Sequence, residues 1–135
     1  MRYLLDTSIV IGAMKGHPLV RQRLERTPAA NVLLSPVVLG ELAFGARKSA
    51  HVARNEARVA ELAAAFQVPP MDARASLHYG EVRARLERQG LPIGANDTWI
   101  AAHALALEAV LVTDNVREFS RVPSLMVENW TIEGA

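Results

Sequence analysis

The sequence contains no cysteine, and its four histidines are far apart. Without cysteine the chain has no disulfide bond, no thiolate metal site and no cysteine nucleophile. No two histidines have the i, i+4 spacing that places a pair of zinc ligands on one helical face; they are His17, His51, His78 and His103. A histidine-based zinc site is therefore not expected.

Long apolar runs are also missing. No stretch approaches the roughly 18 apolar residues that a membrane-spanning helix needs. Asp6 interrupts the apolar N-terminal segment at a point where the core of a signal peptide would be continuous. We therefore expect no association with a membrane and a cytoplasmic location.

The chain lacks a large excess of charge of either sign. Its net charge is +1, from 15 basic and 14 acidic residues, which argues against a protein that coats nucleic acid by bulk electrostatics. Only Lys15 and Lys48 are lysines, and all other basic residues are arginines, whose planar guanidinium groups bind phosphates bidentately. A local contact with nucleic acid and a compositional habit of the genome explain the arginines equally well.

What the sequence does contain is the composition of one globular domain. It has 135 residues, of which 50% are hydrophobic and 21% charged. Short apolar runs rich in branched residues alternate with longer segments of helical period, a pattern typical of a parallel sheet covered by helices. We expect a single α/β domain over residues 1–135, an α/β/α sandwich with a mainly parallel sheet of about five strands.

The expected elements follow from apolar periodicity and from glycine and proline breaks. The expected strands are Arg2–Leu5, Val32–Ser35, Gln67–Val68, Ala109–Thr113 and Leu125–Asn129. The expected helices are Thr7–Lys15, Leu19–Arg26, Pro36–Lys48, Ala53–Phe66, a helix capped by Asp72 that ends at Gly90, and Thr98–Leu107.

Three of the four aspartates lie directly after an expected strand or at the start of an expected helix. They are Asp6, Asp97 and Asp114. The carboxyl ends of parallel strands form the crevice in which ligands of such sheets bind, so these side chains could share one pocket. Aspartate is also a favoured helix N-cap, and capping explains each position equally well when it is taken alone.

Glu41 distinguishes the two explanations. It lies in the middle of its helix, where it cannot be a cap, on a face otherwise formed by apolar residues such as Val38 and Leu42. A buried carboxylate is costly unless it is paired, protonated or bound to a cation. Arg47, six residues further on, is not on the same face.

Four carboxylates in one pocket would repel one another and raise each other's pKa values unless a cation compensated them. Ligands that are all oxygen suit Mg²⁺ or Mn²⁺. Such an ion lowers the pKa of a bound water and neutralises a phosphodiester during attack. A hydrolytic nuclease with catalytic and metal-binding residues Asp6, Glu41, Asp97 and Asp114 is the natural hypothesis.

At these residues the sequence resembles the PIN-domain family, and within it the VapC-type toxins of bacterial toxin–antitoxin pairs. The resemblance covers nearly the whole chain through the ordered segments YLLDTSIVI, ELAFGARKS, GANDTWIAAHAL, VLVTDNVREF and SLMVENW. It implies a parallel α/β/α fold and an endoribonuclease that depends on Mg²⁺ or Mn²⁺. Asp6 and Asp97 correspond to the main direct ligands, and Glu41 and Asp114 to acids that act directly or through water.

The resemblance further implies supporting residues and partners. Thr113 and Asn115 occupy family positions around Asp114 and are expected to orient it, with Asn96 similarly placed beside Asp97. The implied partners are an RNA substrate, a cognate VapB-like antitoxin that reaches toward the acidic pocket, and a second copy of the chain in a homodimer.

Three other classes fit the residues less well. A response-regulator-like phosphoacceptor needs a lysine near the last strands, and no lysine follows Lys48. A phosphatase with a nucleophilic aspartate needs a second aspartate two residues later, where this chain has Ser8. A catalytically silent binding module would not require all four acids, and a housekeeping nuclease without an antitoxin partner remains the alternative within the enzyme class.

Overall fold

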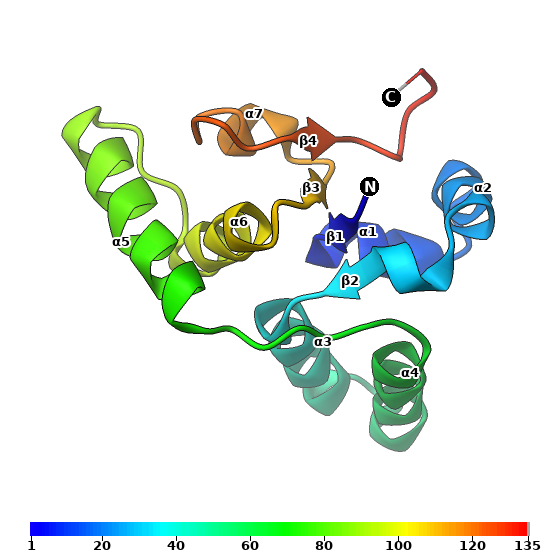
Figure 1. Cartoon of the computed structure of the whole chain (residues 1–135). Coiled ribbons are helices and arrows are strands. Elements are labelled where there is room, and N and C mark those ends of the chain that lie inside the picture. Colours follow the sequence, from blue (N-terminus) through cyan, green and yellow to red (C-terminus); the bar gives the residue numbers. More distant parts are fainter. Residues whose placement is uncertain (135) are drawn as a thin grey trace.

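A four-stranded parallel sheet forms the centre of the computed structural model, which describes residues 1–134. Strand β1 (Tyr3–Leu5) lies between β2 (Val32–Leu34) and β3 (Val110–Val112), and β4 (Val127–Glu128) forms the edge beyond β3 (Figure 1). The branched and leucine residues of β1, β2 and β3 are almost all buried, as expected for strands with both faces covered. The expected α/β class is confirmed.

The expected third strand, Gln67–Val68, is reduced to one bridge. Leu33 pairs with Gln67 in parallel, and the Leu34 amide donates to the Gln67 carbonyl at 2.9 Å. Pro69 and Pro70 follow at once, and proline has no amide hydrogen with which to continue the ladder. Pairing therefore stops after a single residue, and the sheet has four strands within the described residues.

Helices cover both faces of the sheet (Figure 1). Helices α1 and α2 lie on one side, α6 with α5 and α7 on the other, and α3 and α4 pack together beyond β2. Their bounds are α1 Thr7–Met14, α2 Pro18–Arg26, α3 Pro36–Lys48, α4 Val52–Ala65, α5 Ala73–Arg88, α6 Ala95–Leu107 and α7 Val116–Phe119, with a 3-10 turn at Ala29–Asn31. Among residues 1–134, no helix has both the length and the apolarity to span a bilayer.

Helix α6 has a larger buried fraction than any other helix among the described residues. Seven of its 13 residues are buried, and four of these are alanines, which allow neighbouring elements to approach closely. The helix begins at Ala95, three residues earlier than expected, and the Thr98 amide already bonds to the Gly94 carbonyl at 2.9 Å. Asp97 therefore lies inside the first helical turn and is not the residue that caps it.

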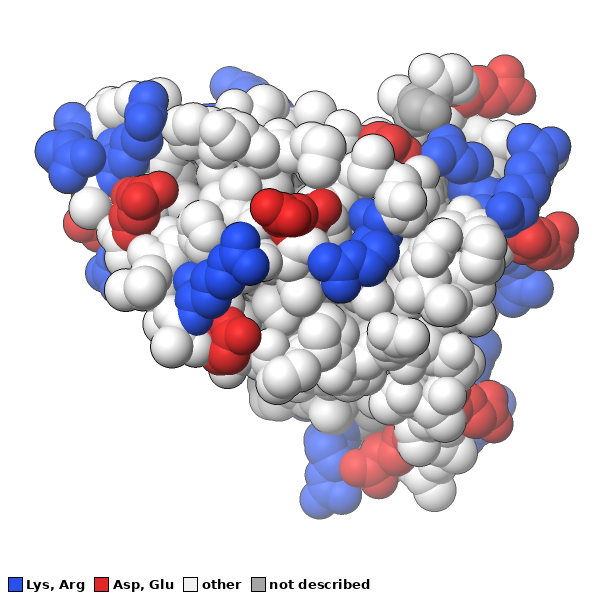
Figure 2. Space-filling model, viewed as in Figure 1, with Lys and Arg blue, Asp and Glu red and all other residues white. Residues whose placement is uncertain are grey.

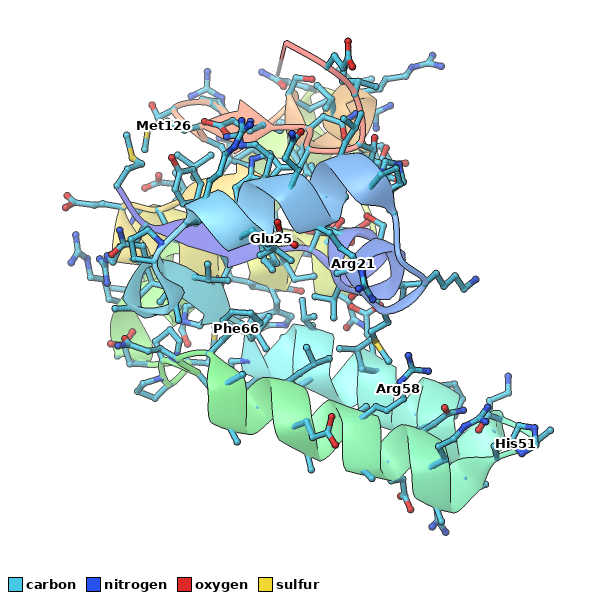
Figure 3. All side chains as sticks on the ribbon, turned by 90° about the vertical axis from the view of Figure 1, so that its right-hand side faces the viewer. Arg21, Glu25, His51, Arg58, Phe66 and Met126 are labelled. Carbon is cyan, nitrogen blue, oxygen red and sulfur yellow. The ribbon has the colours of Figure 1, made fainter. Side chains whose placement is uncertain are left out.

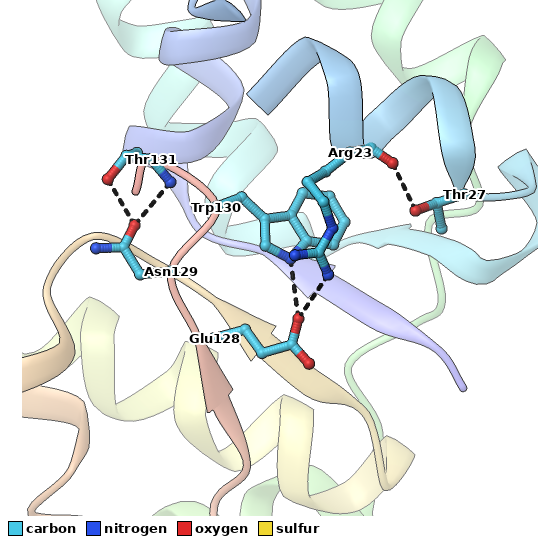
Figure 4. Close-up of polar contacts among 6 residues, drawn as sticks. All are labelled: Arg23, Thr27, Glu128, Asn129, Trp130 and Thr131. Carbon is cyan, nitrogen blue, oxygen red and sulfur yellow. Dashed lines mark hydrogen bonds and ion pairs between the residues drawn. The ribbon is translucent and has the colours of Figure 1, made fainter. Parts of the chain in front are cut away.

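A cluster around Trp130 joins the end of the chain to α2 (Figure 4). The Trp130 indole is fully buried, and its Nε1 donates to Glu128 Oε1 at 3.0 Å. Arg23 of α2 donates to the same oxygen at 3.0 Å and lies over the indole, 4.9 Å from the ring centre. Tyr3 of β1 packs on the ring from another side, with centroids 5.3 Å apart.

Trp130 should therefore be a major contributor to stability. Trp130→Ala is expected to lower the free energy of unfolding by roughly 3–5 kcal/mol, because it removes a large buried ring and leaves a cavity. Urea denaturation followed by circular dichroism measures the change. Ile132→Ala, two residues away and 58% exposed, is the matched control and should change stability little. Equal stability of both variants would contradict the proposed importance of the cluster.

Candidate active site: a carboxylate pocket

Asp6 is held where β1 ends and α1 begins. Its backbone amide donates to the Val112 carbonyl at 2.8 Å, which continues the ladder with β3. One carboxylate oxygen accepts from the Thr7 amide at 2.8 Å, so Asp6 does cap α1. The other accepts from the Thr113 hydroxyl at 2.7 Å. Asp6 therefore caps α1 and is also fixed at the carboxyl edge of the sheet, and its role as a metal ligand stays a prediction.

A short chain of hydrogen bonds extends from Asp6 through the loop after β3. The Thr113 hydroxyl that donates to Asp6 accepts from the Asn115 amide at 3.0 Å. The Asn115 side chain donates to Glu118 Oε2 at 2.9 Å. Thr113 thus orients Asp6 and Asn115 orients Glu118, while the expectation that both orient Asp114 stays a prediction.

Several acidic side chains act electrostatically on Asp97. Burial is the largest cause that raises the pKa of Asp97 to about 6, and the negative charges of Asp6, Glu118 and Glu41 raise it further. Elements from three separate parts of the chain bring these side chains together, namely the end of β1, helix α3 and the segment that follows β3. The structure thus brings Asp6, Glu41 and Asp97 near enough to interact electrostatically, and their role as metal ligands stays a prediction.

Glu41 enters the pocket from α3 without a basic partner. Its carboxylate accepts from the Thr7 hydroxyl at 3.2 Å. Arg47 instead lies near Glu56, with 3.6 Å between Nη1 and Oε2. The mid-helix position and the absence of an Arg47 pair agree with what the sequence predicts for Glu41.

The structure places Glu118, and not Asp114, among the acids that act electrostatically on Asp97. Asp114 is exposed and raises the pKa of Asp6 as the smallest of the causes that act on it. The sequence motifs do not single out Glu118, whose negative charge is one of the causes that raise the pKa of Asp97. The sequence feature that could have identified Glu118 is the N-x-x-E spacing from Asn115 to Glu118 after a strand, which resembles a capping box. Asn96 is exposed beside Asp97, and its supporting role stays a prediction.

The pKa of Asp6 is also raised. Burial is the main cause, since the residue is only 7% exposed, while hydrogen bonds from Thr113 and Thr7 act in the opposite direction. Those bonds stabilise the charged form and partly offset the cost of burial. A carboxylate held this way is available as an acceptor or ligand with its orientation already set.

The donor set fits a hard divalent cation. The ion pairs found in the described part of the chain leave all five acids of the pocket without an arginine or lysine partner. Within residues 1–134, however, no three His, Cys, Asp or Glu side chains are arranged closely enough to hold a metal ion as they stand. Shared binding would require side-chain rotation or bridging water, and Mg²⁺ usually keeps several of its waters.

A family model described as the PIN domain matches residues 3–125, more than nine-tenths of the chain. The chain belongs to the PIN-domain family. This PIN domain is 39% identical over 132 residues to "Ribonuclease VapC2" of Rickettsia felis, covering 96% of this chain and 98% of the relative. It is 37% identical over 131 residues to "tRNA(fMet)-specific endonuclease VapC" of Salmonella typhimurium, with 96% and 98% covered. The resemblance to VapC-type proteins is thereby confirmed.

Solved structures agree with this assignment. The chain superposes on DNA-bound VapBC from Salmonella typhimurium with a TM-score of 0.91 at 37% identity, covering 96% of this chain and 98% of that one. VapBC-1 from nontypeable Haemophilus influenzae gives a TM-score of 0.89 at 38% identity, with 98% and 100% covered. The PIN fold therefore extends over essentially the whole chain.

The raised pKa of Asp97 predicts a pH-dependent stability. The folded protein keeps the Asp97 proton up to about pH 6, whereas the unfolded chain releases it near 3.8. Folding favours the protonated form between these values, so the free energy of unfolding should fall as the pH rises from about 4 to 6. Asp97→Asn should weaken this fall and raise the melting temperature at pH 7 in the presence of chelator.

Thermal melting followed by circular dichroism from pH 4 to 8 measures the effect. Glu133→Gln, an exposed change outside the pocket, serves as the charge-matched control. A lower melting temperature for Asp97→Asn than for the parent protein at pH 7 would show that Asp97 is stabilising as a carboxylate.

Proposed function

We propose that this PIN-domain protein is a metal-dependent endoribonuclease and the toxin of a toxin–antitoxin pair. It hydrolyses RNA phosphodiesters at a site formed by Asp6, Glu41 and Asp97 together with Glu118, with Asp114 at the rim. Relatives over nearly the full chain are named ribonucleases, which supports a nuclease. The cofactor is Mg²⁺ or Mn²⁺.

The observation that carries the proposal is the electrostatic state of Asp97. Three other carboxylates raise its pKa in addition to burial, and no lysine or arginine is among the causes of the shift. Such an arrangement costs stability, and a divalent cation would offset the repulsion. The same all-oxygen donor set is what Mg²⁺ and Mn²⁺ prefer.

The bound cation would supply charge neutralisation and an activated water. The protein's own groups set the geometry. Thr113 and the Thr7 amide hold the two oxygens of Asp6 in fixed directions. Thr7 also donates to Glu41, so one residue orients acids from β1 and α3. With its pKa raised to about 6, Asp97 is deprotonated at neutral pH and can accept a ligand there.

The proposal predicts cleavage that depends on metal and on specific acids. The purified chain should cut RNA in Mg²⁺ or Mn²⁺ and lose this activity in chelator. Initiator tRNA is the first substrate to test, because two relatives are named for tRNA(fMet). Asp6→Asn should reduce kcat/KM by roughly 100-fold or more, since the amide keeps the cap but loses the charge. Cleavage that persists without metal would overturn the mechanism.

The same assay ranks Glu118 against Asp114. Glu118→Gln should reduce kcat/KM by about 10- to 100-fold, the range for groups that support a metal site. Asp114→Asn should have a smaller effect, because Asp114 is exposed and influences only Asp6. Thr113→Ser should retain more activity than Thr113→Val, since it keeps the hydroxyl. An Asp114 effect larger than that of Glu118 would restore the assignment made from the sequence.

A surface suited to the antitoxin runs along α4. One hollow of about 520 Å³ between α1, α3 and α4 has Glu41 and Thr7 among its lining residues, together with apolar Ile11 and Leu42. A second hollow of about 360 Å³, between α2 and α4, shares Met14 with the first and ends at Leu62 and Phe66. Figure 3 shows side chains of α2 facing those of α4 across this surface.

This surface supports the proposal of a VapB-like partner. An amphipathic antitoxin segment would bury apolar side chains along α4 and bring a basic group to Glu41. Solved structures of similar chains are VapBC complexes, which agrees with a partner of this kind. On the face of the molecule seen in Figure 2, which has the view of Figure 1, Lys and Arg side chains alternate with Asp and Glu and form no single extended basic patch.

A positive charge introduced into the hollow between α2 and α4 should separate antitoxin binding from RNA cleavage. Leu62→Arg is expected to weaken antitoxin binding at least about 10-fold while leaving RNA cleavage intact. Ala57→Arg, on an exposed side of the same helix, is the matched control and should bind normally. Calorimetric titration with the protein of the neighbouring upstream reading frame measures both. Unchanged affinity for Leu62→Arg would place the antitoxin elsewhere. The homodimer and the cytoplasmic location remain predictions, and light scattering of the isolated chain tests the first.

A further inference from the structure

A third hollow, separate from the two along α4, lies beside α6, the helix that carries Asp97. It has a volume of about 250 Å³ and lies between α5 and the start of α6. Leu86, Ile93 and Ala95 provide apolar surface, and Tyr79, Arg83 and Glu87 of α5 provide polar groups. This volume is below the roughly 300–1,000 Å³ of sites for drug-sized molecules, so it suits a single ring system.

Only one residue of backbone separates this hollow from the carboxylate pocket. Ile93 and Ala95, which line the hollow, are the two neighbours of Gly94. A Cβ added at Gly94 would come within 3.9 Å of Asp97 Oδ2. A nucleotide with its phosphate at the carboxylates could therefore place an adjacent base in the hollow.

The polar groups of the hollow are paired with one another on the surface of α5, where the Arg83 and Glu87 side chains are 56% and 55% exposed. Arg83 donates from Nη1 to the Tyr79 hydroxyl and from Nε to Glu87 Oε1, both at 3.0 Å. The Tyr79 ring stacks on Trp99 of α6, with centroids 3.9 Å apart and an interplanar angle of 18°. Arg83 keeps further N–H donors, and Glu87 keeps a second oxygen for an outside ligand.

We propose that this hollow, the base pocket, binds one nucleobase of the RNA next to the phosphodiester that is cleaved. A donor from Arg83 beside an acceptor from Glu87 complements the guanine edge, which offers the O6 acceptor next to N–H donors. The apolar wall contacts the face of the ring, as in other pockets for unstacked RNA bases. The inference rests on the proposed function and extends it to the choice of cleavage site.

Cleavage of an RNA pool of randomised sequence tests the base pocket. With Mg²⁺ or Mn²⁺, sequencing of the new ends should show a guanine preference at one position beside the cut. Glu87→Gln and Arg83→Gln should each reduce that preference about 10-fold, within the range for a good bidentate base contact, and should lower cleavage at guanine sites more than at other sites. Glu81→Gln and Arg85→Gln, on the same helix but outside the pocket, are the matched controls.

A binding experiment keeps the inference independent of activity. RNA from the same pool is captured by the immobilised protein in chelator, where no metal-dependent cleavage occurs, and is then sequenced. Guanine enrichment at one position that disappears in Glu87→Gln supports the base pocket. No enrichment, or equal enrichment in that variant, overturns it even if the wild-type protein cleaves RNA. Absence of cleavage by the wild-type protein would instead count against the proposed function, and a changed oligomeric state of Glu87→Gln would assign the hollow to a protein interface.

Discussion

Repulsion among carboxylates at the carboxyl edge of the sheet is the constraint around which the rest of the structure is arranged. Asp6 cannot move away from the other acids, because it ends β1, caps α1 and accepts from Thr113 of the neighbouring segment. Asp97 cannot move far either, because it sits in the first turn of the deeply buried α6. The fold therefore concentrates negative charge at a place where burial makes that charge costly. The remaining elements must supply the stability that this edge loses.

Packing around α6 and Trp130 provides that compensation. The alanines of α6 let the helix lie close to its neighbours, and the aliphatic strands are covered on both faces. At the far edge, Glu128 joins Arg23 and the Trp130 indole through one oxygen, so the last strand is tied to α2. Apolar burial along α6 begins within one turn of Asp97. The charged pocket can thus be retained for chemistry without loosening the sheet that positions it.

Strong periodic signals in the sequence predicted most of this arrangement, and weak local signals did not. Glu41 was identifiable because a carboxylate on an apolar helical face conflicts with its surroundings, and Asp6 because it follows a branched strand. Glu118 was missed because α7 has only four residues, too few to show a period, and Asp114 stands immediately after the apolar strand in its place. The expected strand at Gln67–Val68 is a single bridge in the structure because two prolines follow it. The start of α6 at Ala95 could not be predicted because its N-cap residue, Gly94, provides no capping side chain.

Two hollows lie next to the acids and have no lining residue in common, which gives the site two distinct approaches. Glu41 and Thr7 line the hollow beside α4, whereas Gly94 separates Asp97 from the base pocket. A basic group arriving along α4 would meet Glu41 first and could neutralise the acids by charge alone. It would not need to touch Arg83 or Glu87. On the two proposals, inhibition by a partner would involve Glu41 and selection of a base would involve Arg83 and Glu87, so a substitution in one surface should leave the residues of the other in place. The carboxylates lie beside both hollows, and a charged ligand in either hollow would act on the other through the charge of these acids.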